Sequence, residues 1–338
     1  MISSISPFRF ALLRKVPPRL VLVVVVAAGA WLFSAFYTLH WNPEIKVFKH
    51  AAEVKIAWSK YLDEQYTNKF VVFGGSSSTF SVDAGYALRE CHVPIANLAL
   101  GAGLGAKVLS RFALEELRPG DTAVMMMEPG LFASDLDPPQ LGTQLSIAIG
   151  KPHHAHPSRR IIVNERLPWR NYFAALRPGG YHFFTLLGKW VRRQPLYRYA
   201  PADFDHSGHQ QTSVRRAVTP PGTMVTLSPD AREWLLELKS HCEEQGISLI
   251  YALPWAYCPP ELTAKFQREN AAFLLQMSEF MTVLREDRLG AYSTAEHFAD
   301  TSFHLNKEGA AIRTSELCRA LSINYFWRQD ELRSQARQ

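Results

Sequence analysis

The stretch Val71-Val72-Phe73-Gly74-Gly75-Ser76-Ser77-Ser78 decides how this chain folds. Its first half is apolar and β-branched, which predicts a buried strand, and the glycine pair predicts a sharp turn after it. Because glycine turns without a Cβ penalty, the turn leaves a serine hydroxyl exposed at the carboxyl end of the strand. Such a serine is a weak nucleophile until a neighbouring base removes its proton.

A second polar cluster, near the other end of the chain, contains a candidate for that base. The segment Asp300-Thr301-Ser302-Phe303-His304-Leu305-Asn306 places a carboxylate four residues before a histidine. His304 can take the serine proton while Asp300 holds the histidine ring in the required tautomer. Position in the turn favours Ser76 as the nucleophile, with Ser77 and Ser78 as competitors. The structural alternative for Ser76 is a helix N-cap, where serine is common.

Short apolar runs alternate with helical segments between these two clusters. Further strands are expected at 94–100, 122–127 and 247–253, and helices at 81–91, 107–117, 228–244, 261–280 and 307–321. This alternation predicts an α/β fold with a doubly wound, largely parallel sheet in a flavodoxin-like, three-layer arrangement. Sites in such sheets lie beyond the carboxyl ends of the strands. The turn at 74–78, the loop at 101–105, Glu128 and Trp255 should therefore share one face.

Acyl transfer also needs hydrogen-bond donors aimed at the negative charge that develops on the substrate. We expect them from the backbone N–H groups of Ser76 and of Gly101 or Gly103. The alternative is that the glycine-rich loop is only a close-packed turn. Glu128, in Met127-Glu128-Pro129-Gly130, is either a buried structural carboxylate or a site residue. Ser77 and Trp255 are further candidate site residues.

The N-terminal region predicts a membrane anchor. Leu20 to Tyr37 is apolar apart from Ser34, which is about the length that spans a bilayer. Four basic residues precede this run and none follows until Lys46, so the N-terminus should be cytoplasmic. The alternative is a cleaved signal peptide, because Ala28-Gly29-Ala30 resembles a cleavage site.

The two polar clusters resemble those of the SGNH (GDSL-like) hydrolase superfamily, whose nucleophile stands in a Gly-Asp-Ser turn after the first strand. Gly74-Gly75-Ser76 is similar to that turn, and Phe298 to Gly309 is similar to the last block of the family. Three residues separate Asp300 from His304 where the usual block has two. The family often has an Asn after the next strand, where this chain has Glu128. The resemblance covers roughly 68–125 and 228–322, and is strongest to membrane-anchored proteins of alginate-acetylation and D-alanylation type.

The resemblance implies a periplasmic serine acyl-esterase or acyltransferase anchored in the inner membrane of a bacterium. It would act on O-acyl groups, most simply O-acetyl groups, of an envelope or exported polysaccharide, with no metal or other cofactor. A multi-pass membrane acyltransferase would be its partner. Because the Asn is missing, a non-catalytic assembly or binding subunit with the same fold is the alternative.

The expected organisation is a cytoplasmic basic segment at 1–19, a transmembrane helix at 20–41, a helical stalk at 42–67, an SGNH-like domain at 68–325 and a polar tail at 326–338. The domain is interrupted at about 140–226 by an insertion without clear periodicity. From Lys151 to Ala200 the insertion has ten Lys/Arg and one acidic residue, Glu165, interleaved with aromatic residues near its end. This composition suits an interfacial helix on anionic head groups or a dock on a membrane partner, and the alternative is a solvated basic cap over the site.

Two histidine groups in the insertion raise the question of metal binding. His153, His154 and His156 lie between prolines, and Asp205, His206 and His209 form a second group. With no carboxylate or cysteine beside the first group, we interpret both as surface loops rather than metal sites.

Charge and cysteine content bear on the partners and the kinds of site that this chain could have. The net charge of +6 favours an anionic surface or partner, but no nucleic-acid-binding motif accompanies it, so we expect no nucleic-acid partner. The four cysteines have no zinc-site spacing. Buried free thiols are expected, with a single Cys242–Cys258 disulfide as the alternative.

Overall fold

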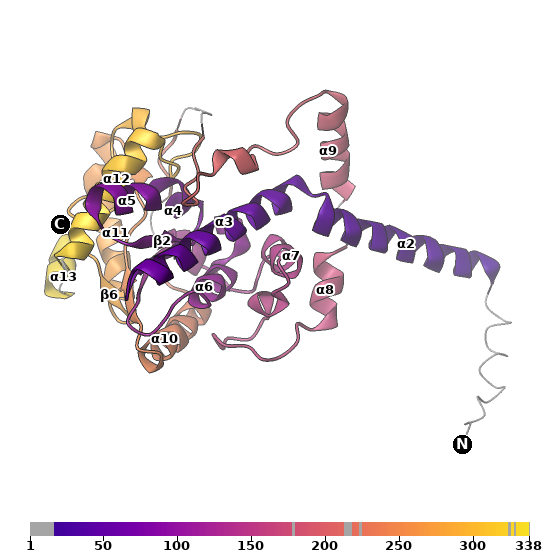
Figure 1. Ribbon diagram of the computed structural model, residues 1–338, viewed down its shortest axis with the longest axis horizontal. Coiled ribbons are helices and arrows are strands. Elements are labelled where there is room, and N and C mark those ends of the chain that lie inside the picture. Colours follow the sequence, from indigo (N-terminus) through magenta and orange to yellow (C-terminus); the bar gives the residue numbers. More distant parts are fainter. Residues whose placement is uncertain are drawn as a thin grey trace, which may run out of the picture.

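The computed structural model describes residues 17–177, 180–212, 218–222, 225–323, 326–327 and 329–337. A long helix, α2 (Pro18–His40), projects from an α/β body (Figure 1). Its apolar side chains are mostly exposed, and an 18-residue window of the helical stretch that begins at Pro18 has a mean hydropathy of 2.3, so this helix is long and apolar enough to cross a membrane. The basic residues expected on its cytoplasmic side, apart from Arg19, lie outside the described residues.

The body is built on a five-stranded parallel sheet with the strand order β2-β1-β3-β4-β6. The strands are β1 (Phe70–Gly74), β2 (Ile95–Asn97), β3 (Thr122–Met126), β4 (Ser248–Tyr251) and β6 (Thr282–Val283). A separate parallel pair joins β5 (Ala256–Tyr257) to β7 (Ala291–Tyr292). The prediction of an α/β fold with a largely parallel sheet is confirmed. Strand order reverses at β1, so β1 and β3 flank the switch point where such sheets bind ligands.

Helices cover both faces of the sheet, and strand residues alternate between the two cores with the period of two that strands impose. One core joins Val71, Phe73 and Met125 to helices α3 (Pro43–Gln65), α6 (Ala106–Leu114), α10 (Pro229–Glu244) and α11 (Thr263–Met277). The other joins Val72 and Val124 to α5 (Ala84–Cys91) and α12 (Lys307–Ser322). The predicted cap of α10 is present, since Ser228 Oγ accepts a hydrogen bond from the Ala231 N–H at 3.1 Å.

The segment expected to be a stalk is helical, but it is part of the body rather than a spacer. Helix α3 buries the side chain of Lys55, whose Nζ donates to the Asn97 carbonyl at 2.8 Å. The Trp58 indole N–H donates to the Ile95 carbonyl at 2.9 Å. Helix α3 therefore packs along the edge of the sheet that β2 forms. Its apolar positions predicted a helix but did not show what the helix would pack against.

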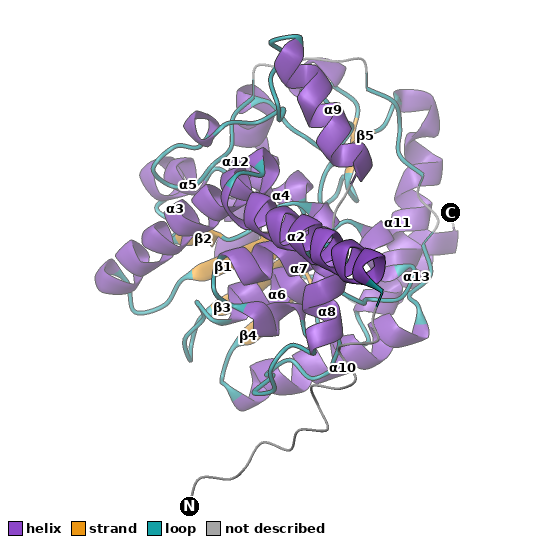
Figure 2. Cartoon of the chain, turned by 90° about the vertical axis from the view of Figure 1, so that its right-hand side faces the viewer, coloured by secondary structure: helices purple, strands orange, loops and turns teal. Residues whose placement is uncertain are grey.

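The insertion is partly helical, with α7 (Gln140–Ala148), α8 (Trp169–Ala175) and α9 (Gly180–Val191). Helices α8 and α9 flank α2 on the side from which it projects (Figures 1 and 2). The expected polar tail instead forms helix α13 (Gln329–Arg337), which packs against α11 and buries Leu332. All four cysteines are free, and three of them are buried, which matches the preferred prediction.

Candidate functional site

The turn after β1 presents one of its three serines and buries the other two. Ser76 is the first residue of α4 (Ser76–Ser81) and is partly exposed. Ser78 is buried and its hydroxyl donates to the Met126 carbonyl. Ser77 is also buried, and its Oγ has no hydrogen-bond partner among the described residues. Ser76 is therefore the serine of this turn that a substrate could reach.

Asp300 and His304 are in direct contact. His304 Nδ1 and Asp300 Oδ1 are 2.8 Å apart. An ionised carboxylate only accepts hydrogen bonds, so Nδ1 carries the proton in this contact and Nε2 remains available as a base. The distance fits the role expected of Asp300, which is to orient the histidine ring.

Two residues of the insertion complete the surroundings of Asp300. Arg198 Nη1 lies 2.7 Å from Asp300 Oδ2, and the Tyr199 hydroxyl donates to the same oxygen at 2.9 Å. The Tyr199 hydroxyl also lies 3.2 Å from His304 Nδ1. Neither residue was predicted as part of the site. Both belong to the basic, aromatic stretch that the sequence indicated, but no motif connected them to Asp300.

These contacts determine the charge of Asp300. Burial alone would raise the pKa of its carboxyl, but hydrogen bonds from His304, Tyr199 and Arg198, with the charge of His304, hold that pKa well below its usual value. Burial and the nearby Asp300 charge raise the pKa of the Tyr199 hydroxyl, which keeps its proton and acts as a donor. Arg198 and Tyr199 thus keep the Asp300 carboxylate ionised beside the His304 imidazole.

Ser76 and His304 line the same cavity, of about 210 Å³. Phe80, one helical turn after Ser76, stacks on the His304 ring with centroids 4.2 Å apart, and so brings the imidazole close to the turn. Within the described part of the chain, no hydrogen bond joins Ser76 to His304. Such contacts are often loose before a substrate binds.

The glycine-rich loop also reaches this cavity. Gly101 and Gly103 both line it, and Thr79 ties the loop to α4 because its hydroxyl donates to the Leu100 carbonyl at 2.6 Å. A Cβ on Gly101 would lie 2.7 Å from the Phe48 ring. The loop is therefore closely packed, as the structural alternative proposed, and its backbone also borders the cavity.

Glu128 lies behind the turn and does not line the cavity. Its Oε1 accepts a hydrogen bond from the Ser77 N–H at 3.1 Å. A Cβ on Gly75 would lie only 2.2 Å from its Oε2, so a larger residue at this position would have to displace the carboxylate. Of the two interpretations left open, the contacts favour a structural carboxylate that fastens the serine turn.

Trp255 also lies away from the cavity. It is buried, stacks on Tyr292 with centroids 4.5 Å apart, and contacts the guanidinium of Arg313. These contacts make it a core residue.

No known family model, curated protein or solved structure matches this chain. The resemblance to SGNH hydrolases therefore stays a prediction from the sequence.

The interpretation of the first histidine group as a surface loop without a carboxylate was wrong. His154 is fully buried, and the Nε2 atoms of His153 and His154 lie 2.7 and 2.6 Å from Glu115 Oε1. The three side chains are close enough to share a metal ion. Lys151 pairs with the other oxygen of Glu115, so both carboxylate oxygens already have partners within the protein. Glu115 lies far from these histidines in the sequence, so the local motif did not indicate that they would meet.

The second histidine group was also misinterpreted. His209 is buried, and Asp205 Oδ1 accepts hydrogen bonds from the backbone N–H groups of Ser207 and His209 at 2.8 and 3.1 Å. The segment closes against Lys55 of α3, since a Cβ on Gly208 would lie 2.5 Å from Lys55 Cγ. This part of the insertion is a packed structural turn.

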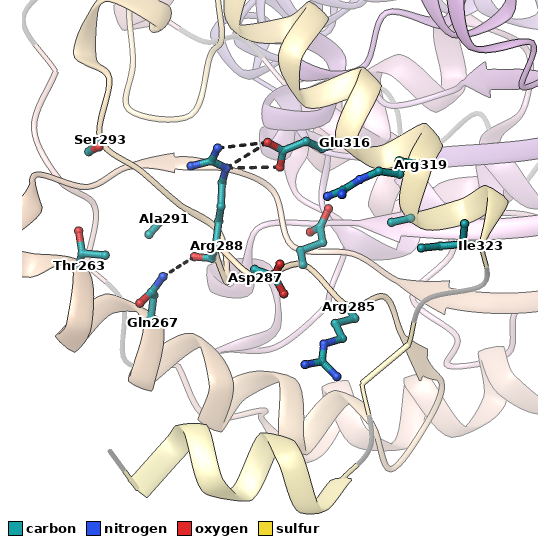
Figure 3. Close-up of a pocket in the computed structure, with 12 residues that line it drawn as sticks. Thr263, Gln267, Arg285, Asp287, Arg288, Ala291, Ser293, Glu316, Arg319 and Ile323 are labelled. Carbon is teal, nitrogen blue, oxygen red and sulfur yellow. Dashed lines mark hydrogen bonds and ion pairs between the residues drawn. The ribbon is translucent and has the colours of Figure 1, made fainter.

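A larger cavity, of about 580 Å³, lies between α11 and α12 but lacks this chemistry (Figure 3). Arg288 of its wall pairs with Glu316 at 3.2 Å, and Arg285 pairs with Glu331 at 2.8 Å. Acidic and basic side chains are mixed on its wall, and among the described residues neither a histidine nor a cysteine lines it. We therefore place the candidate site at the smaller cavity.

Replacing Tyr199 by Phe should lower kcat roughly 10-fold to 100-fold, because a hydrogen bond to a charged group contributes about 1.5–3 kcal/mol. The variant keeps the ring beside Phe80 but loses the donor to Asp300. Tyr197→Phe is the matched control, since Tyr197 also lines the cavity, whereas the described partners of Asp300 are His304, Tyr199 and Arg198. Steady-state kinetics with an acetyl ester measures the effect. Equal kcat values for wild type and Tyr199→Phe would remove Tyr199 from the site.

Proposed function

We propose that this chain is a membrane-anchored serine acyl-esterase or acyltransferase that acts on O-acyl groups of an envelope or exported polysaccharide. The observation that carries the proposal is one cavity lined by both Ser76 and His304, with His304 Nδ1 held by Asp300. A reachable serine, a base and an orienting carboxylate are the three parts of a hydrolytic triad.

In the proposed reaction, Ser76 Oγ attacks the ester carbonyl carbon and His304 Nε2 takes the serine proton. Backbone N–H groups near Ser76, Gly101 and Gly103 would stabilise the negative oxygen that forms. The C–O bond to the sugar then breaks and the sugar oxygen receives the proton from His304. Water or an acceptor hydroxyl releases the acyl group from Ser76 by the same steps in reverse. Asp300 stays ionised and stabilises the imidazolium.

The cavity supports a short acyl group. Its volume lies below the roughly 300–1,000 Å³ of sites for drug-sized ligands. Val47, Phe48 and Ala51 from α3 and Leu100 give it an apolar wall, which suits the methyl of an acetyl group. The anchoring helix and the basic residues before it favour a single-pass inner-membrane protein with a periplasmic body. A multi-pass membrane acyltransferase remains the proposed donor of the acyl group.

A second candidate function is a non-catalytic assembly or binding subunit. Glu128 is the observation that favours it, because it occupies the position where the resembling family often has an oxyanion-binding Asn. In this chain that side chain holds the Ser77 N–H instead of facing the cavity.

Hydrolysis of p-nitrophenyl esters of increasing chain length tests both the reaction and the acyl group. We expect the full-length chain in detergent to prefer the acetate over the octanoate by about 10-fold to 100-fold in kcat/KM. The reason is that forcing extra methylenes into a packed apolar space costs about 1–3 kcal/mol. Equal kcat/KM values would contradict the short-acyl assignment, and no turnover of any ester would favour the non-catalytic alternative.

A further inference from the structure

Helices α8 and α9 expose large apolar side chains to an unusual degree. Trp169 of α8 is 79% exposed, and Trp190 of α9 is 67% exposed. Phe173 of α8 and Phe184 of α9 are more than half exposed as well. Tryptophan is mostly buried in soluble domains, and clustered apolar exposure marks a contact surface. We call these four side chains the collar.

The exposed apolar side chains of α9 have the arrangement of an interfacial helix. Phe184, Leu187, Trp190 and Val191 are exposed and recur at three- and four-residue spacing, so they share one side of the helix. Leu186, on another side, is buried toward the body. Basic residues border both helices: Arg166, Arg170, Arg177, Arg192 and Arg193 are exposed, and Lys189 is half-buried. An apolar face with basic borders is typical of helices that lie in a membrane surface.

A direct contact sets the depth of α8 relative to α2. The Trp31 indole of α2 stacks on the Phe173 ring, with centroids 5.4 Å apart and planes at 9°. The Trp31 N–H also donates to the Phe173 carbonyl at 3.2 Å. Trp31 lies six residues before Tyr37, the end of the apolar run, which is about 9 Å along a helix. Interfacial helices lie about 5–10 Å deep in the boundary between head groups and acyl chains.

We propose that α8 and α9 are interfacial helices embedded in the same bilayer leaflet from which α2 emerges into the body. The collar inserts among the acyl chains on either side of α2, where Figure 2 shows both helices, and the basic residues contact anionic lipid head groups. This surface continues the lipid-exposed side of α2, which is why lipid rather than another protein is its occupant. The inference depends on α2 as a span and is independent of the proposed esterase chemistry.

The test measures where single nitroxide labels lie in the full-length protein after reconstitution into lipid vesicles. The vesicles contain phosphatidylcholine with about 30% phosphatidylglycerol, which supplies anionic head groups. Labels are placed by Trp190→Cys and Trp169→Cys in a Cys91→Ser background, because the other native cysteines are buried. Leu236→Cys on α10 is the matched control, since Leu236 is an exposed apolar residue outside the collar, at 55% exposure.

Collision with dissolved oxygen and with a water-soluble nickel complex reports the surroundings of each label. We expect the oxygen-to-nickel ratio to be about 10-fold higher at 190 and 169 than at 236, because oxygen concentrates in the hydrocarbon and the complex stays in water. Equal ratios at all three positions would show a water-exposed collar and overturn the proposal. Low collision with both reagents at 190 and 169 would show protein packing and would also overturn it.

Discussion

Replacing Ser76 by Ala should abolish labelling by a fluorophosphonate probe and reduce kcat by at least about 10⁴-fold, since loss of a triad nucleophile removes the acylation step. The side chain is partly exposed and begins α4, so the change removes no buried contact of the fold. In-gel fluorescence of the labelled protein and initial rates with p-nitrophenyl acetate measure the two effects.

The adjacent serine offers a matched control for this experiment. Ser77 Oγ is buried and unpartnered among the described residues, so Ser77→Ala should keep both labelling and turnover. Thermal unfolding of both variants checks that the fold is intact. Labelling that survives in Ser76→Ala and disappears in Ser77→Ala would show that Ser77 is the nucleophile. Labelling that survives in both variants would contradict the proposed triad.

Replacing Asp300 by Asn should lower kcat by about 10³-fold to 10⁴-fold, because an amide can favour the wrong tautomer of His304 and no longer stabilises the imidazolium. The variant should stay folded, since Arg198, left without its partner, is partly exposed and can be hydrated. Asp203→Asn is the control, because the Asp203 carboxylate accepts a hydrogen bond from the nearby Ala200 N–H, at 2.7 Å, and does not line the cavity. A fully active Asp300→Asn variant would contradict the role given to this carboxylate.

Acid titration of stability provides a second measurement on the same variant. The pKa of Asp300 is depressed in the folded state, so its ionised form stabilises the fold above the unfolded value of about 3.9. This stabilisation is lost as pH falls below that value toward the folded pKa. Between about pH 4 and pH 2 the wild type should therefore lose more unfolding free energy than Asp300→Asn. Parallel acid unfolding curves would show that Asp300 gains nothing from its partners.

The elements with a local sequence signal could be predicted. The turn around Gly74 and Gly75, the apolar β1 run and the Ser228 cap each depend on neighbouring residues, and the structure contains all three. The contact of Asp300 with His304 was also expected from their spacing, and it forms at 2.8 Å.

The features that the sequence did not predict depend on contacts between residues far apart in the chain. Arg198 and Tyr199 meet Asp300 across about a hundred residues, and Glu115 meets His154 across thirty-nine. The burial of α3 is of the same kind, because its periodicity was visible but its partner strand was not. No local pattern contains such pairings, since packing and charge select them only when the whole chain has folded.

The connection between α2 and α3 has a consequence for what this protein can reach. Only Trp41 and Asn42 separate the two helices, and Asn42 caps α3 by accepting a hydrogen bond from the Glu44 N–H at 3.0 Å. Glu44 itself lines the candidate cavity. A long flexible tether would let a domain sweep a wide volume, whereas two capped residues allow almost no excursion. The cavity is therefore held at a fixed position relative to α2, and any substrate must be brought to that position.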